Sequence, residues 1–95
     1  MDDNRGAAYR TSPDTACAAV PGGAVIIHLG TNRYFSLNAT AAVVWGRLDA
    51  GDDASMIAAA LARDFKIDDV TAREAVARTI AQFEEAGLLL RKADM

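Results

Sequence analysis

The chain has 95 residues, of which 52% are hydrophobic and 24% are charged, and its formal net charge is −3. These values predict one small globular domain with a single core and leave no material for a second domain. Because ten basic and thirteen acidic residues are interspersed along the chain, they do not form the clustered positive field that binding to a nucleic acid requires.

Signals for secretion and for membrane insertion are missing from the sequence. The N-terminal region contains no hydrophobic signal segment, and no apolar run approaches the ~20 residues that a membrane span needs. We therefore expect a cytoplasmic protein without a membrane partner. Its single cysteine, Cys17, excludes an internal disulfide and is expected to stay reduced.

The N-terminal half predicts a short arm and a three-stranded meander. Residues 1–14 are polar, lack a hydrophobic period and end in a turn signal, so we expect a mobile arm. An alanine-rich strand candidate over residues 15–20 turns through Pro21 and two glycines into a stronger candidate over residues 24–29. A turn over residues 30–32, with glycine or asparagine at positive φ, leads to a third strand.

The third strand, over residues 33–37, runs directly into a helix. Its apolar residues alternate with period two, whereas Ala41, Val44, Trp45 and Leu48 then form one helical stripe. We expect Asn38 to cap this helix, which should span residues 39–50 and place Trp45 in the core.

Two further helices follow. We expect an aspartate from each of the pairs 52–53 and 68–69 to cap them, and Gly87 to end the last one after residue 86. The expected fold is therefore of the α+β class, a three-stranded antiparallel sheet followed by three helices. The domain should cover residues 15–91, with a frayed C-terminus over residues 92–95.

The third predicted helix has an apolar arc that charged residues interrupt. At about 100° per residue, Arg73 and Glu84 fall inside the arc. Since charged side chains are rarely fully buried, we expect a partly open strip that forms a shallow groove. The strip consists of Val70, Arg73, Ala77, Ile80, Ala81 and Glu84. The opposite side of the helix, which includes Arg78 and Gln82, is expected to be a solvated face.

The residue pattern supports neither catalysis nor metal binding. A nucleophile needs an adjacent base, but the only histidine, His28, is expected on the outward register of one strand, and Cys17 in the core on another. The chain contains no Cys-x-x-Cys, no His-Glu-x-x-His and no calcium loop. We therefore expect a protein that is not an enzyme and has no metal site and no cofactor.

The candidate binding element is the edge of the third strand. Its residues are Arg33, Tyr34, Phe35, Ser36 and Leu37. A strand at a sheet margin presents unpaired backbone groups that accept another extended chain unless they are covered. From the residues alone two interpretations remain open, since either a peptide adds to this edge or the N-terminal arm covers it.

The order Arg33-Tyr34-Phe35-Ser36-Leu37-Asn38, followed by Ala41-Ala42 and Trp45, resembles the small PqqD-like proteins. These are leader-peptide recognition domains, or RiPP recognition elements, of ribosomally made and post-translationally modified peptides. The resemblance implies a winged-helix variant that holds the leader peptide of a precursor as an added strand, which favours the first interpretation. The tyrosine-aromatic-x-Leu-Asn run and the helix tryptophan resemble the stand-alone proteins of lasso-peptide biosynthesis more closely than the pyrroloquinoline-quinone member.

By this resemblance the protein is a non-catalytic module that presents the precursor to a leader peptidase and a macrocyclase. One alternative is a PqqD-type chaperone that delivers a precursor to a radical enzyme. Another is a winged-helix DNA-binding protein, in which the second and third helices form a helix-turn-helix. Glu74, Glu84 and Glu85 on the third helix argue against DNA, because a recognition helix needs basic and amide side chains.

Overall fold

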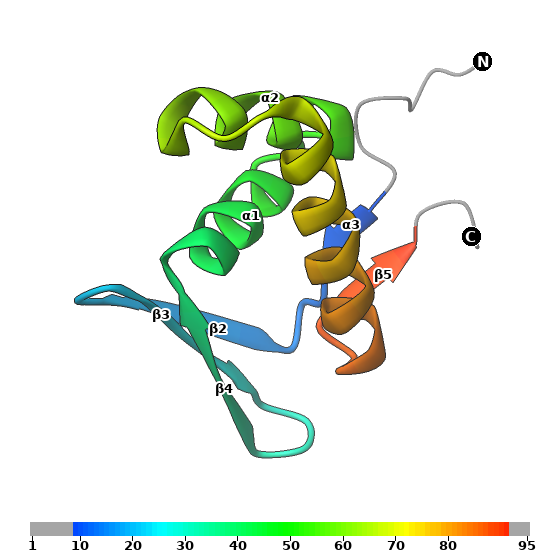
Figure 1. Ribbon diagram of the computed structural model, residues 1–95. Helices are drawn as coiled ribbons and strands as arrows, with labels where there is room; N and C mark the ends of the chain where they lie inside the picture. Colours follow the sequence, from blue (N-terminus) through cyan, green and yellow to red (C-terminus); the bar gives the residue numbers. More distant parts are fainter. Residues whose placement is uncertain (1–8, 92–95) are drawn as a thin grey trace.

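The computed structural model describes residues 9–91, which form a three-stranded sheet, three helices and a two-stranded ribbon (Figure 1). In chain order the elements are β1 (Tyr9–Thr11), β2 (Thr15–Val20), β3 (Gly23–His28), β4 (Arg33–Asn38), α1 (Ala39–Asp49), α2 (Ala54–Phe65), α3 (Asp69–Glu85) and β5 (Leu89–Arg91). The predicted α+β class, with an antiparallel sheet β2-β3-β4 followed by three helices, is confirmed.

Two short turns set the register of the sheet. Val20 pairs with Gly23, and Pro21 and Gly22 form the turn between them. Gly22 has a φ of +81°. The third residue of a type II turn requires such a positive φ, and proline is common just before it. His28 pairs with Arg33, so the β3–β4 loop is one residue longer than predicted. Its positive φ, +63°, belongs to Asn32 and not to the glycine of the loop.

The pairing register determines which side chains face the helices, which lie on one side of the sheet (Figure 1). Ala24 and Ile26 are buried, and His28 shares their face because side chains alternate along a strand. The expected outward register of His28 was therefore wrong, whereas its half-buried side chain agrees with the expectation of a surface or half-buried residue. Its Nδ1 accepts a hydrogen bond from the Thr31 N–H at 3.3 Å.

Cys17 is exposed, so its predicted place in the core was wrong. It pairs with Ile26 and shares that residue's face of the sheet. However, β2 is an edge strand whose residues are exposed or at most half-buried. The alternation of side chains along β2 thus places Cys17 on the face that the helices cover elsewhere. Burial of Cys17 would also require a helix above β2 itself.

Part of the predicted mobile arm, residues 1–14, belongs to the folded domain. Residues 9–11 form β1 and pair antiparallel with β5, and the N–H of the buried Ser12 donates to the Leu88 carbonyl at 2.9 Å. The prediction was therefore wrong for residues 9–14. The three residues of β1 supply the pairing partner for the apolar strand β5 near the end of the chain. The remaining terminal residues, 1–8 and 92–95, lie outside the described part of the chain.

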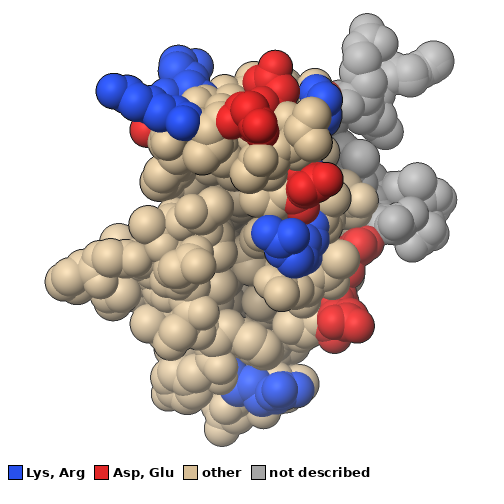
Figure 2. Space-filling view, viewed as in Figure 1, with Lys and Arg blue, Asp and Glu red and all other residues tan. Residues whose placement is uncertain are grey.

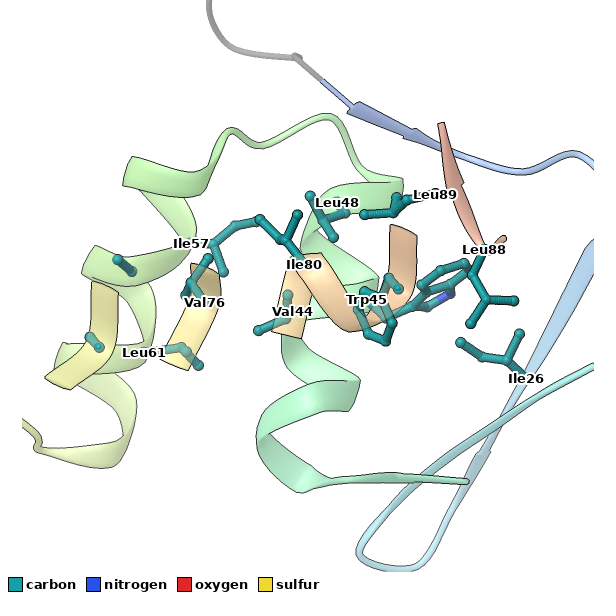
Figure 3. Close-up of a cluster of buried hydrophobic side chains, with 13 residues drawn as sticks. Ile26, Val44, Trp45, Leu48, Ile57, Leu61, Val76, Ile80, Leu88 and Leu89 are labelled. Atoms are coloured by element: carbon teal, nitrogen blue, oxygen red, sulfur yellow. The ribbon is translucent and has the colours of Figure 1, made fainter. Parts of the chain in front are cut away.

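One apolar core joins the sheet to all three helices (Figure 3). In that view Ile26, Trp45 and Leu88 form the sheet end of the core, and Ile57 and Leu61 belong to the α2 end. Trp45 is 5% exposed, which confirms its predicted burial. Its ring meets the ring of Phe83 edge-on, with centroids 5.3 Å apart and planes at 83°, a favoured aromatic geometry.

The helix starts predicted from the sequence are confirmed. Side-chain oxygens of Asn38, Asp53 and Asp68 accept hydrogen bonds from backbone N–H groups three residues on, at 2.7–2.8 Å. Such caps satisfy donors that the helix itself leaves unpaired. The hydrogen bonds from Thr71 also hold the pKa of Asp68 below its usual value.

Gly23 is required by a close approach between β3 and β4, which generates a stability prediction. A Cβ at this position would overlap the carbonyl oxygen of Leu37, whereas a Cβ on Gly46 in α1 would meet nothing within 4 Å. We expect Gly23→Ala to lower the free energy of unfolding by about 1–3 kcal/mol, the range for overpacking. Gly46→Ala should raise it by roughly 0.5–1 kcal/mol, because alanine favours a helix interior. Urea unfolding followed by circular dichroism measures both, and equal stability of Gly23→Ala and the parent would contradict the account.

Candidate peptide-binding site

The β4 strand has one open edge. It pairs with β3 on one side, and within residues 9–91 no strand pairs with its other side. The described part of the N-terminal region binds β5 instead, so residues 9–14 do not cover this edge. Tyr34 is 70% exposed, whereas Phe35 and Leu37 are half-buried against the core. The backbone donors and acceptors of the open edge are thus available to an extended chain.

An apolar hollow of about 330 Å³ lies between β4 and α3. Its walls are Tyr34, Phe35, Ser36 and Leu37 of β4, together with Gln82, Phe83, Ala86 and Leu88. Phe83 forms part of both the hollow and the core, since it is 4% exposed and contacts Trp45. The hollow therefore has a floor that is held by the packing of the whole domain.

A second, more polar hollow of about 390 Å³ continues from the first, and Gln82 lines both. Its other lining residues are Asn38, Thr40, Ala41, Ile67, Ala75, Arg78 and Thr79. We call the two hollows together the β4–α3 groove. Figure 2 shows uncharged atoms over much of this face, with basic atoms over the middle of α3 and near the β3–β4 turn.

Arg33, the first residue of β4, lies at the turn end of the strand and lines neither hollow. Its guanidinium carbon lies 5.4 Å from the centroid of the Phe35 ring, within reach of a cation–π interaction. This contact joins two neighbours on the same face of the strand.

The strip predicted on α3 lies on the other flank of the helix. Arg73 and Ala77 line a separate hollow of about 230 Å³ with Ala54 and Ser55 at the start of α2. Ile80 is 4% exposed and belongs to the core.

Rotation around the helix places the rest of that strip away from β4 as well. At about 100° per residue, Glu84 lies about 160° around the helix from Gln82, and Val70, Ala77 and Ala81 share its side. The structure therefore does not bring these residues to the β4 edge. The face expected to be solvated is exposed at Arg78 and Gln82, and these two residues also line the groove, which the sequence did not predict.

The reason for this error is geometric. An apolar arc that packs on a core has two flanks, and the helical wheel does not distinguish between them. Only the position of α3 over the sheet decides which flank faces β4. For the five predicted β4 residues a role in binding stays a prediction, supported for Tyr34 to Leu37 by their place on the groove.

The titratable groups near the sheet do not form a chemical centre within the described residues. No group of three or more His, Cys, Asp or Glu side chains there is arranged to hold a metal ion. Partial burial, and secondarily the charge of Asp49, raise the pKa of the Cys17 thiol, which disfavours the reactive thiolate. Over the same part of the chain, no helix is long and apolar enough to cross a membrane.

The fold and the groove define a small α+β domain that offers an open strand edge beside an apolar cleft. The family model for coenzyme PQQ synthesis protein D (PqqD) matches residues 23–89. The chain therefore belongs to the PqqD family, as the residue order around β4 predicted. No curated protein matches the chain.

Two solved structures share this fold. One is a lasso peptide synthetase B1 complexed with the leader peptide, with a TM-score of 0.81 and 26% identity over 88% of this chain and 99% of that one. The other is TbiB1 in complex with the TbiA(beta) leader peptide, with a TM-score of 0.79 and 24% identity over 84% of this chain and 93% of that one. At that lower identity the second structure supports the fold alone.

The raised pKa of Cys17 predicts slow alkylation. At a pH near neutrality we expect iodoacetamide to react with the folded protein more slowly than with the protein unfolded in urea, because less thiolate is present. Asp49→Asn removes the negative charge and should lower the pKa of the thiol in part, which speeds the reaction. Alkylation rates measured against pH by mass spectrometry test this, and a folded-state pKa below that of the unfolded chain would contradict it.

Proposed function

We propose that this protein is a non-catalytic module that captures the leader peptide of a ribosomally synthesised precursor by strand addition to β4. The observation that carries the proposal is the open edge of β4 beside the β4–α3 groove. Membership of the PqqD family and the likeness to a leader-peptide complex of a lasso peptide synthetase B1 support it.

The backbone of β4 and the β4–α3 groove would have different roles in recognition. Backbone N–H and C=O groups of β4 bind any extended chain, so they contribute affinity with little selectivity. Because side chains of an added strand alternate, every second residue of the peptide would point toward the groove. Its apolar half, floored by Phe83 and walled by Leu37 and Ala86, would take an apolar anchor residue and so supply specificity.

The bound leader would then be presented to processing enzymes that carry out the chemistry. If the protein acts in lasso-peptide biosynthesis, these enzymes are a leader peptidase and a macrocyclase. A radical enzyme is the corresponding partner if the protein acts as a PqqD-type chaperone. In either case the module holds the precursor and leaves bond-making and bond-breaking to its partners.

The DNA-binding alternative finds less support in the surface of the molecule. Acidic and basic atoms are interspersed on the face that Figure 2 displays. The outward side of α3 carries Glu74 and Glu85 near Arg78. DNA phosphates require a continuous positive field.

Leader binding is the first functional prediction. A synthetic leader peptide of the precursor that this protein serves should bind with submicromolar affinity, which is about −8 kcal/mol or better. A labelled DNA duplex titrated at the same moderate salt concentration serves as the comparison. Salt-sensitive binding of the duplex without binding of the leader would refute the proposal.

A groove-filling substitution gives the second functional prediction. Gln82→Trp places a large ring where the two hollows meet, at an exposed position, and should weaken leader binding by about tenfold or more. Ala77→Trp is the matched control, because it adds the same ring at an exposed position on the other flank of α3.

Both variants should keep the parent's helical circular dichroism, so that a change in affinity reports on the groove. Isothermal titration calorimetry measures the affinities. If Ala77→Trp proves the more damaging of the two, the peptide lies over α2 and α3 and not between β4 and α3.

A further inference from the structure

The β4–α3 groove contains one charged residue among those that line it, Arg78. Its side chain is exposed and forms no salt bridge or hydrogen bond with the described residues. The whole chain carries a net charge of −3. Arg78 is therefore a cation without a partner among the described residues, and it lies in the groove along β4 of a protein with a negative net charge.

The neighbours of Arg78 suit a negatively charged group. Asn38, Thr79 and Gln82 line the same hollow, and they are polar but uncharged. Among residues 9–91, no carboxylate lines either half of the groove. A guanidinium presents a planar set of donors that matches a carboxylate with two parallel hydrogen bonds.

The position of Arg78 along the groove defines where such a carboxylate would stand. The strand β4 and the helix α3 run past each other in opposite directions, since Asn38 lies by Arg78 whereas Tyr34–Leu37 line the half with Phe83 and Ala86. Arg78 is five residues from Phe83, the floor of the apolar half, a rise of about 7.5 Å along the helix. Two residues of a strand span about 6.8 Å.

These spacings agree, and they connect the two halves of the groove. We propose that Arg78 is a specificity-determining residue that selects a leader peptide with an acidic side chain two residues from its apolar anchor. The inference rests on the proposed function, because it assumes that a peptide adds to β4. If the peptide continues the antiparallel order of β2, β3 and β4, it runs from Asn38 toward Arg33, and the acidic residue precedes the anchor.

Arg73 provides an internal control on the same helix. It is also exposed, but it lines hollows on the other flank, together with Ser55 and Asp69. A charge change at Arg73 alters the total charge of the protein as much as a change at Arg78 does. Only the change at Arg78 alters the charge of the β4–α3 groove.

A display library of random peptides long enough to span β4 tests the inference without knowledge of the natural precursor. The library is selected on the full chain, on Arg78→Glu and on Arg73→Glu. We expect the parent and Arg73→Glu to enrich peptides with Asp or Glu two positions before a large apolar residue. Arg78→Glu should instead enrich Lys or Arg at that position.

Affinities of individual peptides make the test quantitative. Replacing the acidic residue of a selected peptide by lysine should weaken binding to the parent and to Arg73→Glu by about tenfold, and should strengthen binding to Arg78→Glu. The difference should shrink as the salt concentration rises, because exposed charges are screened. Equal melting temperatures of the three proteins show that the fold is retained.

The two levels of the proposal fail in different ways. If all three proteins enrich the same apolar peptides without a charge preference, the role of Arg78 is refuted and strand addition stands. If no protein enriches any peptide with an apolar anchor, the proposed function is refuted, and the role of Arg78 falls with it.

Discussion

The contact between Trp45 and Phe83 is the interaction on which the binding surface depends. Trp45 belongs to α1, which follows β4 without a loop, and Phe83 belongs to α3. Their rings meet edge-on at 5.3 Å in the core. Because α1 is fixed to β4 through the cap at Asn38, this contact sets how far α3 stands from β4, and thus the width of the groove.

A groove formed in this way is rigid before a peptide arrives. Its floor, Phe83, is a core residue, and one wall is a paired strand. The peptide loses conformational freedom on binding whereas the protein loses little, which favours affinity at a small interface.

The chain ends contribute by closing the part of the domain opposite the open strand. Leu88 and Leu89 are buried at the end of α3, and β1 covers them through its pairing with β5. The described N-terminal residues are thereby occupied away from β4. The β1–β5 ribbon is separate from the three-stranded sheet, in which the outer sides of β2 and β4 both lack a paired strand within residues 9–91. Of these two edges, only that of β4 borders the β4–α3 groove.

Local signals in the sequence by themselves determined the helices, their caps, the meander and the family. The oxygens of Asn38, Asp53 and Asp68 act on N–H groups three residues away, so their roles follow from short-range geometry. The aromatic and apolar residues of β4 identified the candidate strand for the same reason. Each of these features depends on residues that are neighbours in the chain.

Tertiary structure alone decided the features that depend on contacts between distant segments. The apolar arc of α3 has two flanks that are equivalent on a wheel, and the placement of α3 over the sheet puts Arg78 and Gln82, not Arg73, beside β4. Cys17 shares the face of Ile26 but is exposed because β2 lies at the sheet margin. The strand β1 is too short to give a periodic signal, and it exists because β5, some eighty residues later in the chain, supplies its hydrogen-bond partners.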